Sequence, residues 1–216
     1  MIKACIFDLD GTLADTLESL VYSVGRTLDE LQMPAITREQ CQAFVGNGAR
    51  KLLEKSLEAA GDTGLQKIEQ AMESYGRIFD VHCTYQVTPY EGIIELLKEL
   101  KGRGVKTAVL SNKPHRQTVK VVREVLGDEL IDLAQGQKEE IARKPAPDGV
   151  FEILKTFNIT PEECLYIGDS EVDALTGKNA GVKTVCVTWG FRTEAELQES
   201  GAENLIKKAD ELLKYL

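Results

Sequence analysis

The chain has 216 residues, of which 43% are hydrophobic and 28% charged, and its formal net charge at pH 7 is −9. This composition is ordinary for a globular protein, and the length allows one large domain or two modest ones. The negative charge argues against a general nucleic-acid partner or docking on anionic membranes, although a metal ion or a few local cations could still draw an anionic substrate into one cleft.

Five cysteines are spread along the chain without a CxxC pair. Cys5, Cys164 and Cys186 lie in apolar, strand-like runs, so we expect buried thiols. An odd, unclustered set favours a reducing compartment. No charged lead and apolar h-region precede the first expected strand, and no apolar run approaches the length of a membrane span. We therefore expect a soluble cytoplasmic protein without a membrane partner.

Apolar runs and helix-like stretches alternate through most of the chain. The expected elements of this alternation are, in chain order, a buried strand at 2–7, a helix at 93–101, a strand at 105–110, a helix at 114–126, a short strand at 131–134, a helix at 148–157, a strand at 164–167, a helix at 173–180, a strand at 182–187 and a helix at 209–216. Strands that are continuously apolar and separated by helices imply a parallel sheet covered on both faces.

Between the first and second strands the pattern is helical only. The stretches with helical spacing are 17–31, 38–44, 49–60 and 65–81. The simplest interpretation is a helical subdomain inserted into an α/β domain. We therefore expect a doubly wound α/β core at 1–14 and 87–216, with a helical cap at 15–86.

Polar side chains follow the ends of the expected strands, where open α/β sheets bind their ligands. Each of the three clearest strands runs into such residues, and a proline-flanked loop, "ARKPAP", adds a lysine between the last two. The side chains that should meet at this edge are Asp8, Asp10, Thr12, Ser111, Asn112, Lys144, Asp169 and Asp173.

Several carboxylates in one crevice repel each other and need a cation. Oxygen-only ligands suit Mg²⁺, and Asp8 and Asp169 could hold it. A carboxylate beside a metal-bound phosphoryl group can attack it and form an aspartyl-phosphate. A second carboxyl nearby can then protonate the leaving oxygen and activate the hydrolytic water. Ser111 and Lys144 suit a bound phosphate, as a hydroxyl donor and a point charge.

These motifs resemble, in the expected order, the four motifs of the haloacid dehalogenase-like hydrolases: "DLDGTL", the Ser111 strand end, Lys144 and "GDSEVD". The resemblance covers the whole chain and implies a Rossmann-like core with a small helical cap. The roles that it implies are Asp8 as nucleophile, Asp10 as acid and base that also gives its main-chain carbonyl to Mg²⁺, Asp169 as metal ligand, Asp173 as supporting acid, and Thr12, Ser111, Asn112 and Lys144 as phosphate or substrate ligands.

Two further stretches, "VGNGA" at 45–49 and "VTWGF" at 187–191, are most similar to the phosphoglycolate phosphatases of that superfamily. The loop Gly46-Asn47-Gly48 precedes an expected helix, and its glycines allow close approach of the backbone. A helix N-terminus with Arg50 beside it suits a small carboxylate. We therefore expect the loop and Arg50 to contact the substrate.

The resulting hypothesis is a Mg²⁺-dependent phosphomonoesterase that acts on a small phosphorylated metabolite, with 2-phosphoglycolate as the first candidate. An inorganic pyrophosphatase and a sugar phosphomutase on the same scaffold remain alternatives. A phospho-accepting signalling module is the alternative outside enzymes; it needs a much shorter chain and lacks a second carboxyl placed like Asp10. The sequence sets no oligomeric state.

Overall fold

A six-stranded parallel sheet forms the centre of the computed structural model, which describes residues 1–216. Its strands are β1 (Ala4–Phe7), β4 (Lys106–Pro114), β5 (Leu133–Gln137), β6 (Cys164–Gly168), β7 (Lys183–Val187) and β8 (Leu205–Ile206). They lie in the order β5-β4-β1-β6-β7-β8, so the direction of winding reverses between β1 and β6. This is the doubly wound α/β topology, and the predicted fold class is confirmed.

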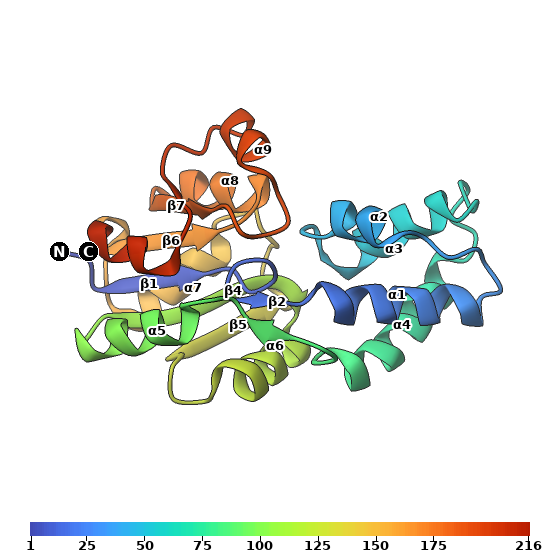
Figure 1. Ribbon diagram of the computed structural model, residues 1–216, viewed down its shortest axis with the longest axis horizontal. Helices are drawn as coiled ribbons and strands as arrows, with labels where there is room; N and C mark the ends of the chain where they lie inside the picture. The colour runs from blue at the N-terminus through green and yellow to red at the C-terminus, as the bar shows by residue number, and fades with distance from the viewer.

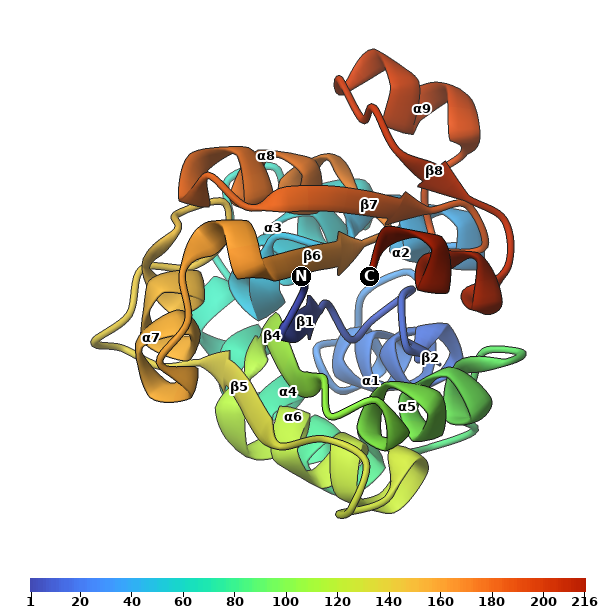
Figure 2. The same ribbon diagram turned by 90° about the vertical axis from the view of Figure 1, so that its left-hand side faces the viewer.

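Helices cover both faces of the sheet (Figure 2). The helices of the core are α5 (Ile93–Gly102), α6 (His115–Val121), α7 (Asp148–Phe157), α8 (Glu171–Ala180) and α9 (Glu194–Glu199). Alternate residues of β1 point to opposite faces: Ala4 and Ile6 pack with α7, while Cys5 and Phe7 belong to the cluster that contains α5. Both faces of β1 are buried, which explains its continuously apolar sequence.

Several predicted boundaries were wrong. β4 runs on to Pro114, past the expected end at residue 110, and its pairing with β5 is irregular between Leu110 and Pro114. The expected helix 114–126 is α6 followed by a π-helical turn, Val122–Leu126, and the expected last helix is a 3₁₀ helix, Ala209–Tyr215. The helix α9, the strand β8 and a 3₁₀ turn at Pro161–Glu163 were not predicted. These three are too short to show a hydrophobic period.

The inserted segment forms a separate helical lobe beside the core (Figure 1). Its helices are α1 (Leu17–Glu30), α2 (Arg38–Phe44), α3 (Gly48–Ala59) and α4 (Ile68–His82), close to the predicted bounds. The apolar faces of α1 and α4 pack together, and Tyr75 stacks on Phe79 with ring centroids 4.9 Å apart. The predicted absence of strands inside the lobe agrees with this arrangement.

Two short strands connect the lobes. β2 (Ala14–Asp15) leads into the cap and β3 (Thr88–Pro89) leads out of it, and they pair antiparallel. The two chain crossings therefore lie side by side. The domain boundaries that we propose, 14/15 and 86/87, fall at this pair.

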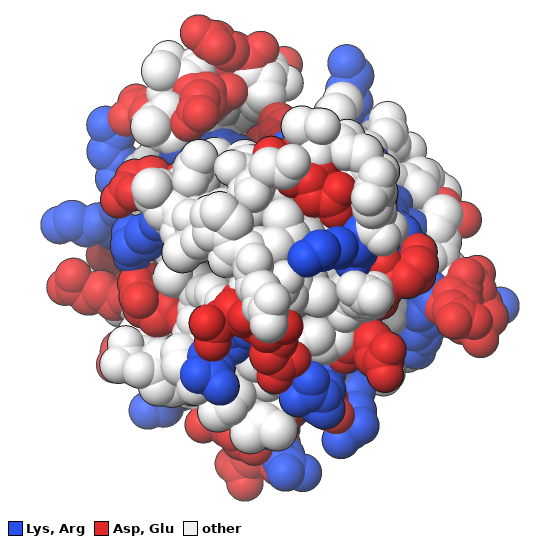
Figure 3. Space-filling model, turned by 90° about the vertical axis from the view of Figure 1, so that its right-hand side faces the viewer, with Lys and Arg blue, Asp and Glu red and all other residues white.

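Charges of both signs lie on the surface, and the cysteines lie inside the protein. On the face that presents the outer end of the cap, Lys and Arg lie beside Asp and Glu around a largely uncharged centre (Figure 3). All five cysteines are buried and free. None of the helices combines the length and the apolar character needed to cross a bilayer.

Glycines inside two helices allow a paired test of packing. A Cβ at Gly25 in α1 would meet no other atom, whereas a Cβ at Gly177 in α8 would overlap the side chain of Thr184 on β7. We expect Gly25→Ala to raise the free energy of unfolding by about 0.5–1 kcal/mol, because alanine loses less backbone entropy on folding. Gly177→Ala should lower it by about 1–3 kcal/mol. Denaturant unfolding measures both, and a shift in the same direction would contradict the packing described for α8.

Candidate active site

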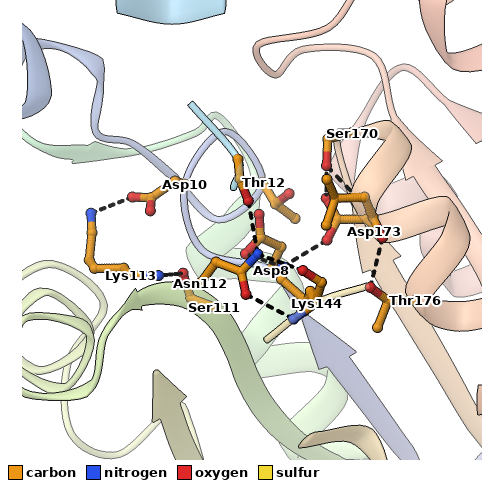
Figure 4. Close-up of polar contacts among 12 residues, drawn as sticks. Asp8, Asp10, Thr12, Ser111, Asn112, Lys113, Lys144, Ser170, Asp173 and Thr176 are labelled. Carbon is orange, nitrogen blue, oxygen red and sulfur yellow. Dashed lines mark hydrogen bonds and ion pairs between the residues drawn. The ribbon is translucent and has the colours of Figure 1, made fainter. Parts of the chain in front are cut away.

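Two carboxylates follow neighbouring strands at the point where the winding of the sheet reverses. Asp8 comes directly after β1 and Asp169 directly after β6. α8 begins two residues later and brings Asp173 into the same crevice, so that one oxygen of each carboxylate lies within 4.8 Å of the others. All three side chains are buried. The structure thus brings these three acids together at a typical ligand-binding position of an α/β sheet. Figure 4 labels two of them, Asp8 and Asp173.

The first turn of α8 fixes Asp173. Ser170 is the N-cap residue, whose hydroxyl oxygen accepts the Asp173 backbone N–H at 3.4 Å and whose proton is donated to Oδ2 of Asp173. The hydroxyl of Tyr166 on β6 donates to Oδ1 of Asp173 at 3.0 Å. Protein donors therefore occupy both oxygens of Asp173.

One buried lysine neutralises part of the negative charge. Nζ of Lys144 lies 2.8 Å from Oδ1 of Asp8 and 2.8 Å from Oδ1 of Asp173. Asn112 in β4 holds the lysine backbone, since its Oδ1 accepts the Lys144 N–H at 2.9 Å and its Nδ2 donates to the Lys144 carbonyl at 3.1 Å. β4 therefore sets the position of the ammonium group between the two acids.

Burial raises the pKa of two of the clustered carboxyls, Asp8 and Asp169. It raises the pKa of Asp8 to about 7; Asp173 and Asp10 add to this effect and Lys144 opposes it. Burial, followed by repulsion from Asp173 and Asp8, also raises the pKa of Asp169 well above its usual value. Burial of Lys144 opposes its charge, but the two neighbouring carboxylates outweigh burial and raise its pKa. The acids thus retain repulsion that a divalent cation would relieve.

Asp10 points away from this cluster (Figure 4). Its Oδ1 accepts hydrogen bonds from the hydroxyl of Thr16, just before α1, and from Nζ of Lys113 in β4. The Lys113 ammonium also lies 5.1 Å from the ring centroid of Phe79 in α4. The Asp10 side chain is therefore held at the junction of core and cap.

Two glycines let other groups approach Asp169 closely. Gly11 has φ of +84°, in the left-handed region, and a Cβ there would overlap the Asp169 carboxylate. A Cβ at Gly190 would overlap both Asp169 and the Gly11 carbonyl oxygen. The backbone N–H of Phe191 donates to Oδ2 of Asp169 at 2.7 Å. This packing fixes the orientation of the carboxylate.

The two predicted hydroxyl ligands differ in access. Ser111 lines the cavity between core and cap, and its oxygen accepts the Lys113 N–H at 3.2 Å, which leaves its proton for another acceptor. Thr12 is fully buried and does not line the cavity; its Oγ1 lies 3.4 Å from Oδ1 of Asp169. The Thr12 hydroxyl is therefore directed at Asp169 and not at the cavity.

The cavity between the lobes is narrow. Its volume, counted as the space that the centres of water molecules can occupy, is about 50 Å³. This is room for about three to five waters. The core contributes charged and polar groups, whereas the cap contributes a mainly apolar roof and two loop glycines. The cap residues that line it are Leu20, Val45, Gly46, Gly48, Ala49, Leu52, Tyr75 and Phe79.

Three core side chains hold the loop of the cap that closes this cavity. The contacts to its consecutive carbonyls are from Arg192 to Val45 at 2.9 Å, from Nδ2 of Asn112 to Gly46 at 2.9 Å and from Arg143 to Asn47 at 3.1 Å. Asn112 uses the same amide group for the Lys144 carbonyl. The position of the cap loop and the position of Lys144 therefore share one side chain.

Arg50, which the sequence predicts to contact the substrate, lies outside the cavity. Its guanidinium pairs with Glu69 at 2.8 Å, and its side chain is 42% exposed. Asn47 does not line the cavity either. The cations that reach the loop are Arg143 and Arg192, which sequence reasoning missed because these contacts span 96 and 147 residues of chain.

The donor set fits a hard divalent cation. Lys144 donates to Oδ1 of Asp8, whereas Oδ2 of Asp8 accepts no hydrogen bond from the protein. Asp169 contributes a second carboxylate in the same crevice, and every ligand on offer there is an oxygen. Mg²⁺ prefers such ligands and keeps several waters. Asp8 and Asp169 are thus the residues that could hold Mg²⁺, with Asp173 behind them.

The sequence of this chain is similar to those of known proteins. A family model described as haloacid dehalogenase-like hydrolase matches residues 5–187. Phosphoglycolate phosphatase 1 of Pseudomonas aeruginosa is 31% identical over 218 residues, which cover 98% of this chain and 78% of that protein. Pyrophosphatase PpaX of Bacillus cereus is also 31% identical, over 216 residues that cover 100% of this chain and 96% of that protein.

A solved structure shares the whole architecture. The crystal structure from Lactobacillus delbrueckii subsp. bulgaricus, of a protein proposed to be a phosphoglycolate phosphatase, superposes with a TM-score of 0.91 at 31% identity. The match covers 99% of this chain and 97% of that chain, so it includes the cap as well as the core.

The raised pKa of Asp8 predicts a pH-dependent stability. A carboxyl whose pKa is higher in the folded state stabilises the fold fully below the unfolded-state pKa, and this contribution is lost as pH rises through the folded-state value. For Asp8 that value is about 7. Without Mg²⁺, the Tm should therefore fall between about pH 4 and about pH 7. Thermal unfolding in EDTA checks this, and Asp8→Asn, which lacks the titrating group, should show a smaller fall. Parallel curves for the two proteins would contradict it.

Proposed function

The chain belongs to the haloacid dehalogenase-like hydrolases and is an enzyme of the phosphatase type, and on this basis we propose that it hydrolyses a small organic phosphate with Mg²⁺ through an aspartyl-phosphate. One observation carries the proposal: Asp8 has a free carboxylate oxygen inside the acid cluster, while Asp10 is held outside the cluster at the same cavity. Two carboxylates in different surroundings suit two different roles.

Asp8 acts as the nucleophile in this proposal. Its Oδ2 attacks phosphorus, so that an oxygen–phosphorus bond forms and the bond to the leaving oxygen breaks. Two protons of Lys144 are engaged by Asp8 and Asp173, and the third remains for a phosphoryl oxygen. The Ser111 hydroxyl is a further donor at the cavity wall. These groups stabilise charge on the phosphoryl oxygens as the bonds change.

Asp10 acts as the acid and then the base. It gives a proton to the leaving oxygen in the first step and takes one from the attacking water in the second. Water then attacks phosphorus and breaks the bond to Asp8, which restores the free carboxylate. The contacts with Thr16 and Lys113 keep the Asp10 side chain turned toward the cap, where the leaving group lies.

Mg²⁺ would be held by Asp8 and Asp169 and would neutralise the phosphate that enters this acidic crevice. Removal of the metal with EDTA should abolish phosphate release, and Mg²⁺ in excess should restore it.

The five buried thiols agree with a reducing compartment, and we propose a cytoplasmic location.

The narrow cavity favours a small substrate, and 2-phosphoglycolate is the first candidate because the relative in Pseudomonas aeruginosa bears that name. Inorganic pyrophosphate is a second candidate, because PpaX is equally similar and covers the chain as completely. Phosphate release from each compound with Mg²⁺, compared as kcat/KM, separates the two. A higher value on pyrophosphate would overturn the assignment to phosphoglycolate.

Asp8→Asn should abolish turnover without unfolding the protein. Asparagine has nearly the same shape, but it is a poor nucleophile and a poor ligand for Mg²⁺. We expect a loss in kcat of at least ~1,000-fold on both p-nitrophenyl phosphate and the natural substrate. Far-UV circular dichroism and Tm control for folding. Substantial turnover by a folded variant would exclude Asp8 as the nucleophile.

Asp10→Asn should separate the two half-reactions. Asp8 can still attack a substrate with a good leaving group, but no carboxylate remains to activate water. Steady-state rates on alkyl phosphates should fall by ~10²–10⁴-fold. With p-nitrophenyl phosphate, a rapid quench should show a burst of nitrophenol and phosphate bound covalently to the protein. A parent-like steady-state rate on alkyl phosphates would rule out the acid–base role.

A further inference from the structure

We propose that Lys113 binds a second anionic group of the substrate, so that the enzyme selects small phosphates that carry a carboxylate or a further phosphate. This inference rests on the proposed phosphatase function. It concerns the end of the cavity that holds the leaving group. The residues that bind the phosphoryl group cannot distinguish one leaving group from another, because every substrate carries the same phosphoryl group.

The cations of the cavity wall are Lys113, Lys144 and Arg192, and all three come from the core. Lys144 is shared by two acids of the cluster. Arg192 is held by Glu171 at 3.0 Å and by the Val45 carbonyl at 2.9 Å. Neither can turn toward a ligand without losing contacts that hold the acid cluster or the cap loop.

Lys113 differs from these two in its contacts. Its side chain is only 2% exposed, and its sole hydrogen-bond partner in the protein is Oδ1 of Asp10. An ammonium group has three protons to donate. The ring face of Phe79 lies on another side of it, at 5.1 Å from the centroid, and supplies attraction but no lone pair. A buried cation at the cavity wall thus retains donors that a ligand in the cavity can reach.

The position of Lys113 matches the leaving group and not the phosphoryl group. It is bonded to Asp10, which would protonate the leaving oxygen, and it lies on the opposite side of Asp10 from the acid cluster (Figure 4). The cap wall around it, with Tyr75 and Phe79, offers no charge of its own. A substrate with a second anion would therefore find its counter-charge on the core at Lys113.

The test compares two substrates that differ mainly in charge, 2-phosphoglycolate and 2-hydroxyethyl phosphate. The quantity measured is the ratio of their kcat/KM values. The parent should prefer phosphoglycolate by at least about 10-fold. Lys113→Gln keeps a donor for Asp10 but removes the charge, so it should lose about 10- to 100-fold on phosphoglycolate and much less on 2-hydroxyethyl phosphate, which has no carboxylate. Lys113→Met should lose the preference as well.

Lys120→Met is the matched control, because Lys120 donates to the Asp80 carbonyl at 3.0 Å and does not line the cavity. It should keep the parental ratio. Equal losses on the two substrates with Lys113→Gln would overturn the proposal and leave Lys113 as a positioning residue for Asp10. A parent that shows no preference would overturn it too.

Calorimetric binding in the Asp8→Asn background separates this proposal from the proposed function. That protein should bind phosphoglycolate more tightly than 2-hydroxyethyl phosphate, and adding Lys113→Gln should remove the difference. This result would support Lys113 even if the parent released no phosphate, an outcome that would count against the phosphatase alone. Equal affinities for the two compounds in the Asp8→Asn protein would overturn the role of Lys113.

Discussion

The crowding of carboxylates between the ends of β1 and β6 is the constraint on which the rest of the site depends. Asp8, Asp169 and Asp173 lie within one small buried crevice, and the protein places a single lysine among them. Such a cluster is tolerable only where cations and hydrogen-bond donors are supplied at fixed positions. The N-cap of α8, the Asn112 contacts with the Lys144 backbone and the glycines packed against Asp169 all supply that rigidity. These local features of the site thus all counter the repulsion among the three carboxylates.

The cap depends on the same residues as the acid cluster. Asn112 joins the carbonyl of Gly46 in the cap loop to the backbone of Lys144, and two arginines of the core hold the neighbouring carbonyls. The cap itself adds mainly apolar surface to the cavity. The charged side chains of the cavity wall therefore all come from the core, while the cap contributes most of its apolar surface.

The sequence predicted those features that follow from short-range pattern. Continuous apolar strands gave the parallel sheet, helical spacing gave the four cap helices, and acids directly after strands gave the crevice that Asp8 and Asp169 form. It could not predict contacts between remote segments. Arg50 looked suited to the substrate because it is near the loop in sequence, but it turns to Glu69. The expected strand ended at residue 110, but β4 runs on to Pro114 and brings Lys113 to Phe79 of the cap.

The central position of β1 has a consequence for how the chain folds. This first strand pairs on one side with residues 106–109 and on the other with residues 164–167, so it stays incomplete until most of the chain has been synthesised. The four helices of the insert pack mainly on one another and lie between β1 and its first partner in the chain. Local helical units form faster than pairings of distant strands, so the cap should be structured before the sheet closes around β1. Asp8 then approaches Asp169 only at that late step. The repulsion between their carboxylates therefore arises at the end of folding, when the packing of the core is already formed and can offset it.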